Sequence, residues 1–253
     1  MMGEKIRLDK YLAEMGLGTR SQIKEAAKKG RIKVDGTVEK RTEQKIDPDC
    51  QNVSFDGKEI SYVKKEYYLL NKPQGVVSAT EDKVHKTVLD LIDGKQRKDL
   101  FPVGRLDIDT EGLLLITNDG DLAHRLLSPR HHVDKQYYAI VSGKLPEDAP
   151  ERFRQGIMLS DGTVTMPALL EILEGKEAVR EEEPCIEEGT RVLITVREGK
   201  FHQIKRMAEA LGCRVVYLKR LSMGTLRLDE TLRPGEYRAL TEEEIRMLRE
   251  ACR

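Results

Sequence analysis

The residues with the clearest chemical potential lie in the segment VGRLDIDTEGLLLITNDG, which runs from Val103 to Gly120. Asp107 stands two residues after Arg105 and shortly before an apolar run, Leu113 to Ile116. A run this apolar is typical of a buried strand, so the carboxylate and the arginine should lie at the mouth of that strand. A carboxylate placed there can act as a nucleophile or a general base. Loop aspartates commonly shape an Asx turn, and for Asp107 and Asp109 this segment alone slightly favours the turn.

Histidines and cysteines do not indicate a second chemical site. His131 and His132 are consecutive and cannot share one face of a strand, and no His-Glu-x-x-His pattern occurs. The four cysteines are scattered without a Cys-x-x-Cys pair, at Cys50, Cys185, Cys213 and Cys252. This spacing argues against a zinc site and against a disulfide framework. We therefore expect no bound metal.

The charges balance overall but are unevenly distributed, with 44 Lys and Arg against 44 Asp and Glu in 253 residues. Residues 1–45 hold twelve basic and seven acidic residues, and Gly199–Arg227 holds seven basic residues and one acidic residue. Negative charge gathers in Glu171–Glu188, which contains eight glutamates. This distribution fits a polyanion-binding face, and on charge alone it fits ordinary solvated faces equally well.

The composition favours a globular protein outside the membrane. No apolar run reaches the length of about eighteen residues that a membrane span needs, and the first residues, MMGEKIRLDK, lack the apolar region of a signal peptide. A hydrophobic fraction of 39% is enough for a core, and a charged fraction of 35% indicates solubility. We therefore expect a cytoplasmic protein with no membrane partner.

The chain divides near residue 61, and its first part predicts two short helices followed by hairpins. Apolar residues from Leu8 to Met15 recur at helical spacing. Thr19 and Ser21 are candidate N-caps for a second helix that stops before Gly30. Two Asp-Gly pairs between alternating segments predict tight turns. Basic residues that could contact phosphates cluster around the second helix: Arg20, Lys24, Lys28, Lys29, Arg31 and Lys33.

The first part also resembles the small RNA-binding domain named after ribosomal protein S4. The resemblance lies in RLDKYLAEMGLGTRSQIKEAAKKGRIKVDGTVEK and covers roughly residues 5 to 60, including the opening RLDKYLA and the hairpin GRIKVDG. It implies that the second helix and the following loop face structured RNA. It implies no particular activity, because such domains are attached to several kinds of protein.

The second part, residues 61–253, predicts an α+β fold with a mixed, mainly antiparallel sheet and flanking helices. Strands are expected at YYLLNK, GLLLIT, QYYAIVSG and RVLITVREG, and helices at DLAHRLLSP, HQIKRMAEALG and TEEEIRMLREACR. Thr241 and Glu244 have the spacing of a capping box, and TVLDLID predicts a short helix with Thr87 as its N-cap. A doubly wound nucleotide-binding fold is not expected, because no glycine-rich phosphate loop follows a strand.

Four motifs of this part occur in the order and at the spacing of one family. YYLLNKPQGVVSAT, FPVGRLDIDTEGLLLITNDG, EGKFHQIKRMAEALG and LRPGEYRAL are similar to segments of the pseudouridine synthases that modify ribosomal RNA. The form EGKFHQIKRM most resembles the branch acting on small-subunit rRNA, since the large-subunit enzymes more often have Arg-Asn-Arg-Gln or Arg-Asn-Arg-Glu there. The resemblance implies the pseudouridine synthase fold over residues 61–253 and an S4-type RNA-binding domain over residues 1–60.

The resemblance also implies a catalytic set. Pseudouridine synthesis breaks the bond between ribose and the base nitrogen, turns the uracil and rejoins it through carbon, and this isomerisation requires no cofactor. The aspartate of the family's Gly-Arg-Leu-Asp motif maps to Asp107, the expected nucleophile. The tyrosine of its Lys-x-Tyr motif maps to Tyr137, whose ring can stack on the flipped uracil and whose hydroxyl can serve proton transfer. The basic residue after His-Gln maps to Lys205, and its positive charge favours an ionised carboxylate.

Further residues of the same motifs are assigned to RNA. In related enzymes the arginine that maps to Arg105 helps to fill the space left by the flipped base. Such a filler has a physical purpose, because a uridine inside folded RNA must be extruded before the enzyme can reach its glycosidic bond. Lys200 and Arg206 are expected to contact phosphates. His202 is expected to pack or to touch RNA.

The remaining polar residues near these motifs are expected to be structural. Asp109 lies off the catalytic motif, and Thr110 is expected to make a local hydrogen bond. Tyr138 follows Tyr137 in a strand, so its ring should point to the opposite face and into the core. Lys135 is left open between an RNA contact and a merely exposed position.

Taken together, the sequence predicts site-specific isomerisation of a uridine to pseudouridine in ribosomal RNA, with 16S small-subunit rRNA as the favoured substrate. A 23S large-subunit enzyme is the alternative with the same chemistry. The rival from another class is a non-catalytic RNA-binding or ribosome-assembly protein, and the joint presence of Asp107, Tyr137 and Lys205 favours the enzyme. The expected partner is ribosomal RNA or an assembling ribosomal subunit, bound by a monomer without a cofactor.

Overall fold

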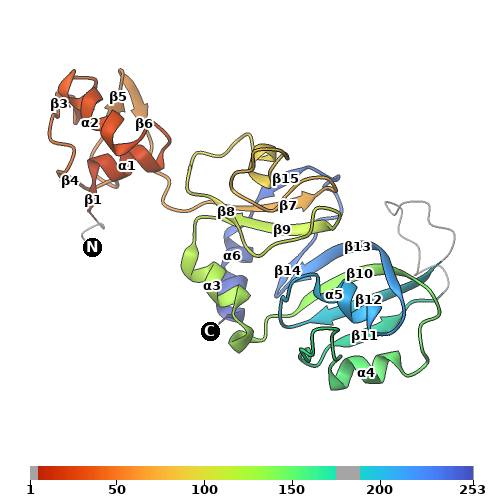
Figure 1. The fold of residues 1–253 in the computed structure, drawn as a ribbon. Coiled ribbons are helices and arrows are strands. Elements are labelled where there is room, and N and C mark those ends of the chain that lie inside the picture. The colour runs from red at the N-terminus through yellow and green to blue at the C-terminus, as the bar shows by residue number, and fades with distance from the viewer. Residues whose placement is uncertain (1–4, 175–188, 253) are drawn as a thin grey trace. The chain divides into compact units, whose positions relative to one another are not determined.

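The chain forms two compact units in the computed structural model, which describes residues 5–174 and 189–252 (Figure 1). One unit runs to Glu66 and takes in the segment Asp93–Leu100. The other consists of Tyr67–Ile92 and the chain from Phe101 onward. The division expected near residue 61 stays a prediction. Most of the acidic run Glu171–Glu188, together with Cys185, lies outside the described residues.

The N-terminal unit combines two short helices, α1 (Leu8–Glu14) and α2 (Arg20–Lys28), with two small antiparallel sheets, β1-β4 and β3-β2-β5-β6. Of the two candidate N-caps, Thr19 caps α2, because its hydroxyl accepts a hydrogen bond from the backbone N–H of Gln22 while the Gln22 side chain accepts one from Thr19. Both predicted Asp-Gly turns form, with an aspartate in the left-handed region at each turn. The strands are β1 (Ile6–Arg7), β2 (Ile32–Val34), β3 (Thr37–Val38), β4 (Lys45–Ile46), β5 (Val53–Phe55) and β6 (Lys58–Ile60).

Arg97 explains why the segment Asp93–Leu100 belongs to the N-terminal unit. Its side chain is only 3% exposed, and it donates hydrogen bonds to Glu14 at 3.0 Å and to the carbonyl oxygen of Val63 at 3.0 Å. Asp99 accepts two further hydrogen bonds from the same guanidinium. Burial opposes the charge of Arg97, but these partners raise its pKa above the ordinary value. The motifs of the sequence contain no signal for this long-range contact.

The second unit is built on one mixed sheet with the strand order β11-β12-β10-β13-β9-β7-β15. Within the described residues every pairing of this sheet is antiparallel except that of β9 with β13. The predicted α+β fold is therefore confirmed. The strands are β7 (Tyr67–Lys72), β8 (Phe101–Pro102), β9 (Glu111–Thr117), β10 (Lys135–Ser142), β11 (Leu169–Ile172), β12 (Thr190–Val196), β13 (Arg214–Met223), β14 (Leu226–Arg227) and β15 (Tyr237–Ala239).

Helices cover the two halves of this sheet and form a separate core with each half. α3 (Gly120–Leu127) and α6 (Glu242–Ala251) pack with β7 and β9, whereas α4 (Ala149–Gln155) and α5 (Gln203–Glu209) pack with β10 and β12 (Figure 1). Met207 of α5 is fully buried, and burying a side chain of this kind stabilises the fold by about 1.5–3 kcal/mol. None of the helices in the described residues is long and apolar enough to span a membrane.

Two short elements refine the sequence prediction. The segment expected as a helix after Thr87 is a single 3-10 turn, η1 (Val88–Leu91), and the backbone N–H of Thr87 donates to Asp90 at 2.8 Å. A second 3-10 turn, η2 (Pro129–His131), follows α3. Each segment forms one short 3-10 turn and does not continue as an α-helix.

The parallel contact between β9 and β13 joins the two halves of the sheet, and it depends on Gly112. Gly112 lies opposite Arg220, and a Cβ atom added at Gly112 would lie 2.3 Å from the carbonyl oxygen of Arg220. The φ angle of Gly112 is +98°, which L-residues with a side chain rarely adopt. In addition, Arg220 donates from Nε to the carbonyl oxygen of Leu113 at 2.7 Å. This close approach holds the start of β9 beside the β10–β13 half.

Candidate active site

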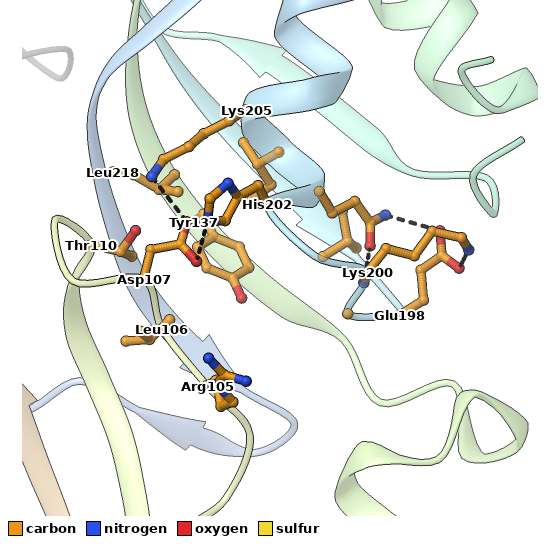
Figure 2. Close-up of a pocket in the computed structure, with 14 residues that line it drawn as sticks. Arg105, Leu106, Asp107, Thr110, Tyr137, Glu198, Lys200, His202, Lys205 and Leu218 are labelled. Atoms are coloured by element: carbon orange, nitrogen blue, oxygen red, sulfur yellow. Dashed lines mark hydrogen bonds and ion pairs between the residues drawn. The ribbon is translucent and has the colours of Figure 1, made fainter. Parts of the chain in front are cut away.

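A pocket of about 80 Å³ opens where the loop before β9, the strand β10 and the start of α5 meet (Figure 2). It contains the three residues predicted to be catalytic, and three of those predicted to contact RNA lie in it as well. The charged and polar residues that line it are Arg105, Asp107, Thr110, Tyr137, Glu198, Lys200, His202, Gln203 and Lys205.

The ammonium group of Lys205, in α5, forms an ion pair with the carboxylate of Asp107, the candidate nucleophile. The distance from Lys205 Nζ to Asp107 Oδ2 is 2.9 Å. The same Nζ lies 2.6 Å from Asp109 Oδ1, so a single cation is shared between two carboxylates. Partial burial opposes the charge of Lys205, but its hydrogen bonds with Asp109 and Asp107 raise its pKa above the ordinary value. The geometry therefore places a positive charge against the Asp107 carboxylate.

Asp109 has an electrostatic contact in addition to the structural role expected from the sequence. It lies in the tight turn in which the backbone N–H of Thr110 donates to the carbonyl oxygen of Asp107 at 3.1 Å. Although partial burial opposes its charge, the hydrogen bond from Lys205 lowers the pKa of Asp109. Its side chain is 61% exposed, more than twice the 26% of Asp107, so Asp107 is the more enclosed of the two.

His202 lies against the candidate nucleophile as well. Its Nε2 atom is 3.6 Å from Asp107 Oδ1, whereas Lys205 contacts the other oxygen of the carboxylate, Oδ2 (Figure 2). His202 is the N-cap of α5 and has a φ of +48°, in the left-handed region where few non-glycine residues are found. The sequence placed His202 in the right motif, but it gave no sign of this contact.

Tyr137 lies beside the Asp107 carboxylate, with its ring facing the pocket (Figure 2). It pairs with Ile194 of β12 on one side and with Arg220 of β13 on the other, so its backbone is fixed within the sheet. The neighbouring Tyr138 is fully buried and makes an edge-to-face contact with the ring of Tyr217. The predicted alternation of the two tyrosines is confirmed.

A buried lysine that the sequence did not single out anchors the Asp107 loop. Lys72, at the end of β7, is 0% exposed, and its Nζ donates to the carbonyl oxygens of Pro73 at 3.0 Å and Thr110 at 2.9 Å. Burial lowers the pKa of Lys72 to about 8. Ser78 holds the other end of the loop by accepting from the N–H of Leu106 at 3.1 Å and donating to its carbonyl oxygen at 2.9 Å. The loop is thus pinned on both sides of Asp107.

Lys200 and Arg206, the expected phosphate contacts, form ion pairs in the structure. Lys200 pairs with the buried Glu198, and Arg206 Nη2 lies 2.5 Å from Asp161 Oδ2. Glu198 also accepts from the Gln203 side chain at 2.9 Å, which fixes the turn before α5. The RNA contacts of these two cations stay a prediction. The sequence did not identify Glu198 and Gln203 as supports, because a buried Glu is recognisable only once its partners are known.

Lys135 is neither exposed nor available to RNA, contrary to both alternatives considered from the sequence. It is 3% exposed, and its Nζ donates to the carbonyl oxygen of Val133 at 3.2 Å. Burial, followed by the charge of Arg220, lowers the pKa of Lys135 to about 8.

Replacing Lys135 by methionine is expected to stabilise the protein at pH 7 by about 1–3 kcal/mol, because a shift of one pKa unit corresponds to about 1.4 kcal/mol. The folded-state pKa lies below the ordinary value of 10.5, so burial of the charge destabilises the wild type fully below about pH 8. This penalty disappears as the pH rises toward 10.5, and the advantage of the variant shrinks with it. Denaturant unfolding at pH 7 and pH 9.5 measures this, with Lys144→Met as the control at an exposed site. An equal difference between variant and wild type at both pH values would contradict it.

The basic cluster expected from the first part of the sequence lies in the N-terminal unit. Arg20, Lys24 and Lys28 recur every fourth residue along α2, and all three are exposed. Lys29 and Lys33 are exposed too. Arg31 is engaged within the unit instead, because it pairs with Asp56 and lies over the ring of Phe55 at 4.9 Å. One face of α2 therefore carries a row of cations.

The described residues contain no group of three or more His, Cys, Asp or Glu side chains arranged to hold a metal ion. The pocket instead combines the Asp107 carboxylate, a lysine bound to it, a histidine and a tyrosine. A carboxylate kept ionised beside an aromatic ring can attack an electrophilic carbon of a planar substrate and return it in a second step.

Comparison with known proteins assigns both units to families. The model of the RNA pseudouridylate synthase family matches residues 66–210, and the S4 domain model matches residues 6–49. The uncharacterized RNA pseudouridine synthase YtzG of Bacillus subtilis is 45% identical over 97% of this chain and 99% of that protein. Ribosomal small subunit pseudouridine synthase A of Yersinia pestis is 40% identical over 95% of this chain and 97% of that protein.

A solved structure gives the same result. The crystal structure of a pseudouridylate synthase covers 96% of this chain and 99% of its own, with 36% sequence identity and a TM-score of 0.63. The family model spans more than half of the chain, and the relatives match it over nearly its full length. The chain belongs to the RNA pseudouridine synthase family and carries an S4 domain at its N-terminal end.

Proposed function

We propose that this protein converts a uridine of 16S small-subunit ribosomal RNA into pseudouridine, with Asp107 as the nucleophile. The observation that supports this most directly is the ion pair of Asp107 with Lys205 at 2.9 Å, inside a pocket that Tyr137 also lines. The choice of the small-subunit RNA is supported by relatives at about 40% identity that are named ribosomal small subunit pseudouridine synthase A. A ribosomal substrate supports a cytoplasmic location, and the residues that line the pocket all come from one chain, which supports a monomer.

The reaction exchanges two bonds without adding or removing atoms. Asp107 attacks the nucleoside, the bond between the ribose carbon and the uracil nitrogen breaks, and the base turns within the pocket. The ribose then bonds to a ring carbon of the uracil while the bond to Asp107 breaks, and the proton of that carbon is transferred so that the nitrogen regains one. Lys205 keeps Asp107 anionic for the attack, Tyr137 stacks on the turning base, and its hydroxyl lies near the departing proton. Arg105 fills the space that the extruded base leaves in the RNA.

Mapping of pseudouridines tests the proposed substrate. Ribosomal RNA from cells that lack this protein is compared with wild-type RNA by carbodiimide modification and primer extension. The loss of one pseudouridine from the small-subunit RNA is the expected result. A loss confined to the large-subunit RNA would overturn the choice of substrate while leaving the chemistry intact, and unchanged modification of both RNAs would overturn the proposed function.

The variant Tyr137→Phe separates the two roles proposed for the tyrosine. It keeps the ring but lacks the hydroxyl, so the rate of pseudouridine formation should fall about 10²-fold while the Kd for RNA stays within about twofold. Tyr137→Ala should in addition weaken binding about tenfold through the lost stacking. Single-turnover kinetics and filter binding measure both quantities. Tyr138→Phe, on the opposite face of β10, is the matched control and should retain the wild-type rate.

We also propose that residues 1–60 form an RNA-binding domain and residues 61–253 the catalytic domain. The exposed cations of α2, Arg20, Lys24 and Lys28, support an RNA-binding role for the first of these. A helix that carries positive charge along one face suits the phosphate backbone, because each phosphate neutralised releases condensed counterions.

Removing this charge should make RNA binding weaker and less sensitive to salt. Arg20, Lys24 and Lys28 are all replaced by Gln in the full chain. The logarithm of the binding constant should then fall less steeply with the logarithm of the salt concentration, with a slope smaller in magnitude by about two to three. The control removes three exposed lysines outside α2, namely Lys40, Lys45 and Lys58. Salt titrations of binding to a small-subunit rRNA transcript measure the slopes, and equal slopes for the two triple variants would count against an RNA contact specific to α2.

A further inference from the structure

Phe201 is the one aromatic side chain exposed to solvent among the Phe and Tyr residues that the structure describes. It is 73% exposed, and it lies in the turn between β12 and α5, next to the pocket residue His202. A large apolar ring left in water gains nothing from the hydrophobic effect. Its position at the edge of the pocket therefore points to a partner that covers it in the working complex.

The turn holds this ring in a fixed place. Phe201 stacks on His202 with a distance of 3.7 Å between ring centroids and an angle of 20° between the planes. The backbone N–H of Lys200 donates to the Gln203 side chain at 2.9 Å, and the N–H of Gln203 donates to the carbonyl oxygen of Lys200 at 3.2 Å. Arg206 donates to the carbonyl oxygen of Phe201 at 3.5 Å. A ring ordered in advance loses little conformational entropy when a partner binds.

The stack is continuous with the candidate active site. His202 contacts Phe201 with one face of its ring. The Nε2 atom of His202 lies 3.6 Å from the Asp107 carboxylate (Figure 2). The pocket beside Asp107 encloses about 80 Å³, far below the roughly 300–1,000 Å³ of sites for drug-sized ligands. A pocket this small suits one extruded base, and the nucleotides on either side of it then lie outside the pocket, where Phe201 adjoins the lining residues Lys200 and His202.

The surroundings of Phe201 favour a nucleobase over an apolar protein surface. Lys200 precedes it in the chain, and Arg206 bonds to its backbone, so two cations, each paired with a carboxylate in this structure, flank a ring that has no other exposed aromatic beside it in the described residues. An aromatic ring within a basic frame is the usual platform for unpaired bases, whereas a protein interface of this type needs a wider apolar patch. On the basis of the function proposed above, we propose that Phe201 stacks on the base next to the target uridine and so positions the RNA strand at Asp107.

Paired changes in the protein and the RNA test this platform. The probe is a synthetic RNA that spans the uridine mapped in the small-subunit rRNA, with each neighbouring nucleotide replaced in turn by an abasic residue. Phe201→Ala should weaken binding of the unmodified RNA about tenfold, whereas Phe201→Tyr, which keeps a ring, should bind as the wild type does. One abasic neighbour should weaken wild-type binding by a similar factor. That same abasic RNA should bind equally to Phe201→Ala and to the wild type, since both partners of the stack are then gone.

The outcomes distinguish the platform from the proposed function. Met158→Ala is the control, because Met158 is an apolar side chain of the same unit with 69% exposure. One outcome is that the wild type forms pseudouridine in the probe while the losses of RNA affinity caused by Phe201→Ala and by each abasic neighbour add up. This result would overturn the proposed stacking of Phe201 on a neighbouring base and leave the proposed function intact. If the wild type forms none in the probe or in rRNA, the proposed function itself is wrong. Wild-type affinity of Phe201→Ala for RNA, together with reduced modification in cells, would indicate a protein partner and overturn the platform.

Discussion

Asp107→Asn is expected to lower the rate of pseudouridine formation by at least about 10³-fold while leaving the affinity for RNA within a few-fold of the wild type. An amide has the shape of the carboxylate but neither its charge nor its nucleophilicity, and loss of a nucleophile is among the largest effects that one substitution produces. The fold should tolerate the change, because Asp107 is 26% exposed and its loop is pinned independently by Lys72 and Ser78. Single-turnover assays on rRNA, read by tritium release from labelled uridine, measure the rate.

Asp109→Asn is the matched control for this substitution. Asp109 is two residues away, has the same chemistry and contacts the same Lys205 ammonium at 2.6 Å. Its removal leaves Lys205 with Asp107 alone, so the activity should fall less than about tenfold. Equal pseudouridine formation by Asp107→Asn and the wild type would eliminate Asp107 as the nucleophile, and a reversed order of the two effects would transfer that role to Asp109.

Local signals in the sequence predicted much of this fold, because the interactions that they report are local. The capping boxes at Thr19 and Thr241 form between residues three apart, and the Asp-Gly turns need only four residues. The alternation that puts Tyr138 in the core follows from strand geometry alone. The 3-10 turn after Thr87 is an exception, since tertiary packing shortened an element whose spacing suggested a helix.

Long-range contacts could not be predicted in this way. The clamp of Lys72 on the Asp107 loop joins residues 38 positions apart, and Arg97 reaches 83 positions back to Glu14. Counting charges could not decide between a polyanion-binding face and ordinary solvated faces, because it does not show which cations of the basic stretch Gly199–Arg227 are buried or paired. Lys219 and Arg220 are buried in β13, and the two cations expected at phosphates each have a carboxylate partner. Burial and pairing are properties of the assembled sheet, and a linear sequence carries neither.

The site was more predictable than the supports around it. Asp107, Tyr137 and Lys205 were assigned from a resemblance to separate motifs, and the structure brings these motifs to one pocket. The contact of His202 with Asp107 was not foreseen, because it depends on a left-handed backbone conformation at the start of α5. Their catalytic roles are predictions that substitutions at each position can decide.

Lys205→Met is expected to reduce the rate about 10³-fold at pH 7, the second-largest effect. Without the ammonium group, Asp107 and Asp109 repel each other, and the anionic form of the nucleophile loses its stabilising partner. Lys205→Arg keeps the charge and should recover part of the rate. A variant rate within tenfold of the wild type would show that Lys205 is dispensable for the attack, whatever its effect on binding.

The stability of the same variant provides a second test, since the sign of its pH dependence follows from the two shifted groups. The pKa of Asp109 is lowered from 3.8, so its contribution is present above about pH 4 and is lost as the pH falls through the lowered value. The pKa of Lys205 is raised from 10.5, so its contribution is present below about pH 10 and is lost as the pH rises through the raised value. Lys205→Met should therefore be less stable than the wild type by a constant amount between about pH 5 and 9 in denaturant unfolding, and this deficit should shrink on either side. A deficit that does not shrink below about pH 4 or above about pH 10 would mean that Lys205 stabilises the site through packing of its methylenes and not through the two ion pairs, in which case the loss of rate could no longer be ascribed to its charge.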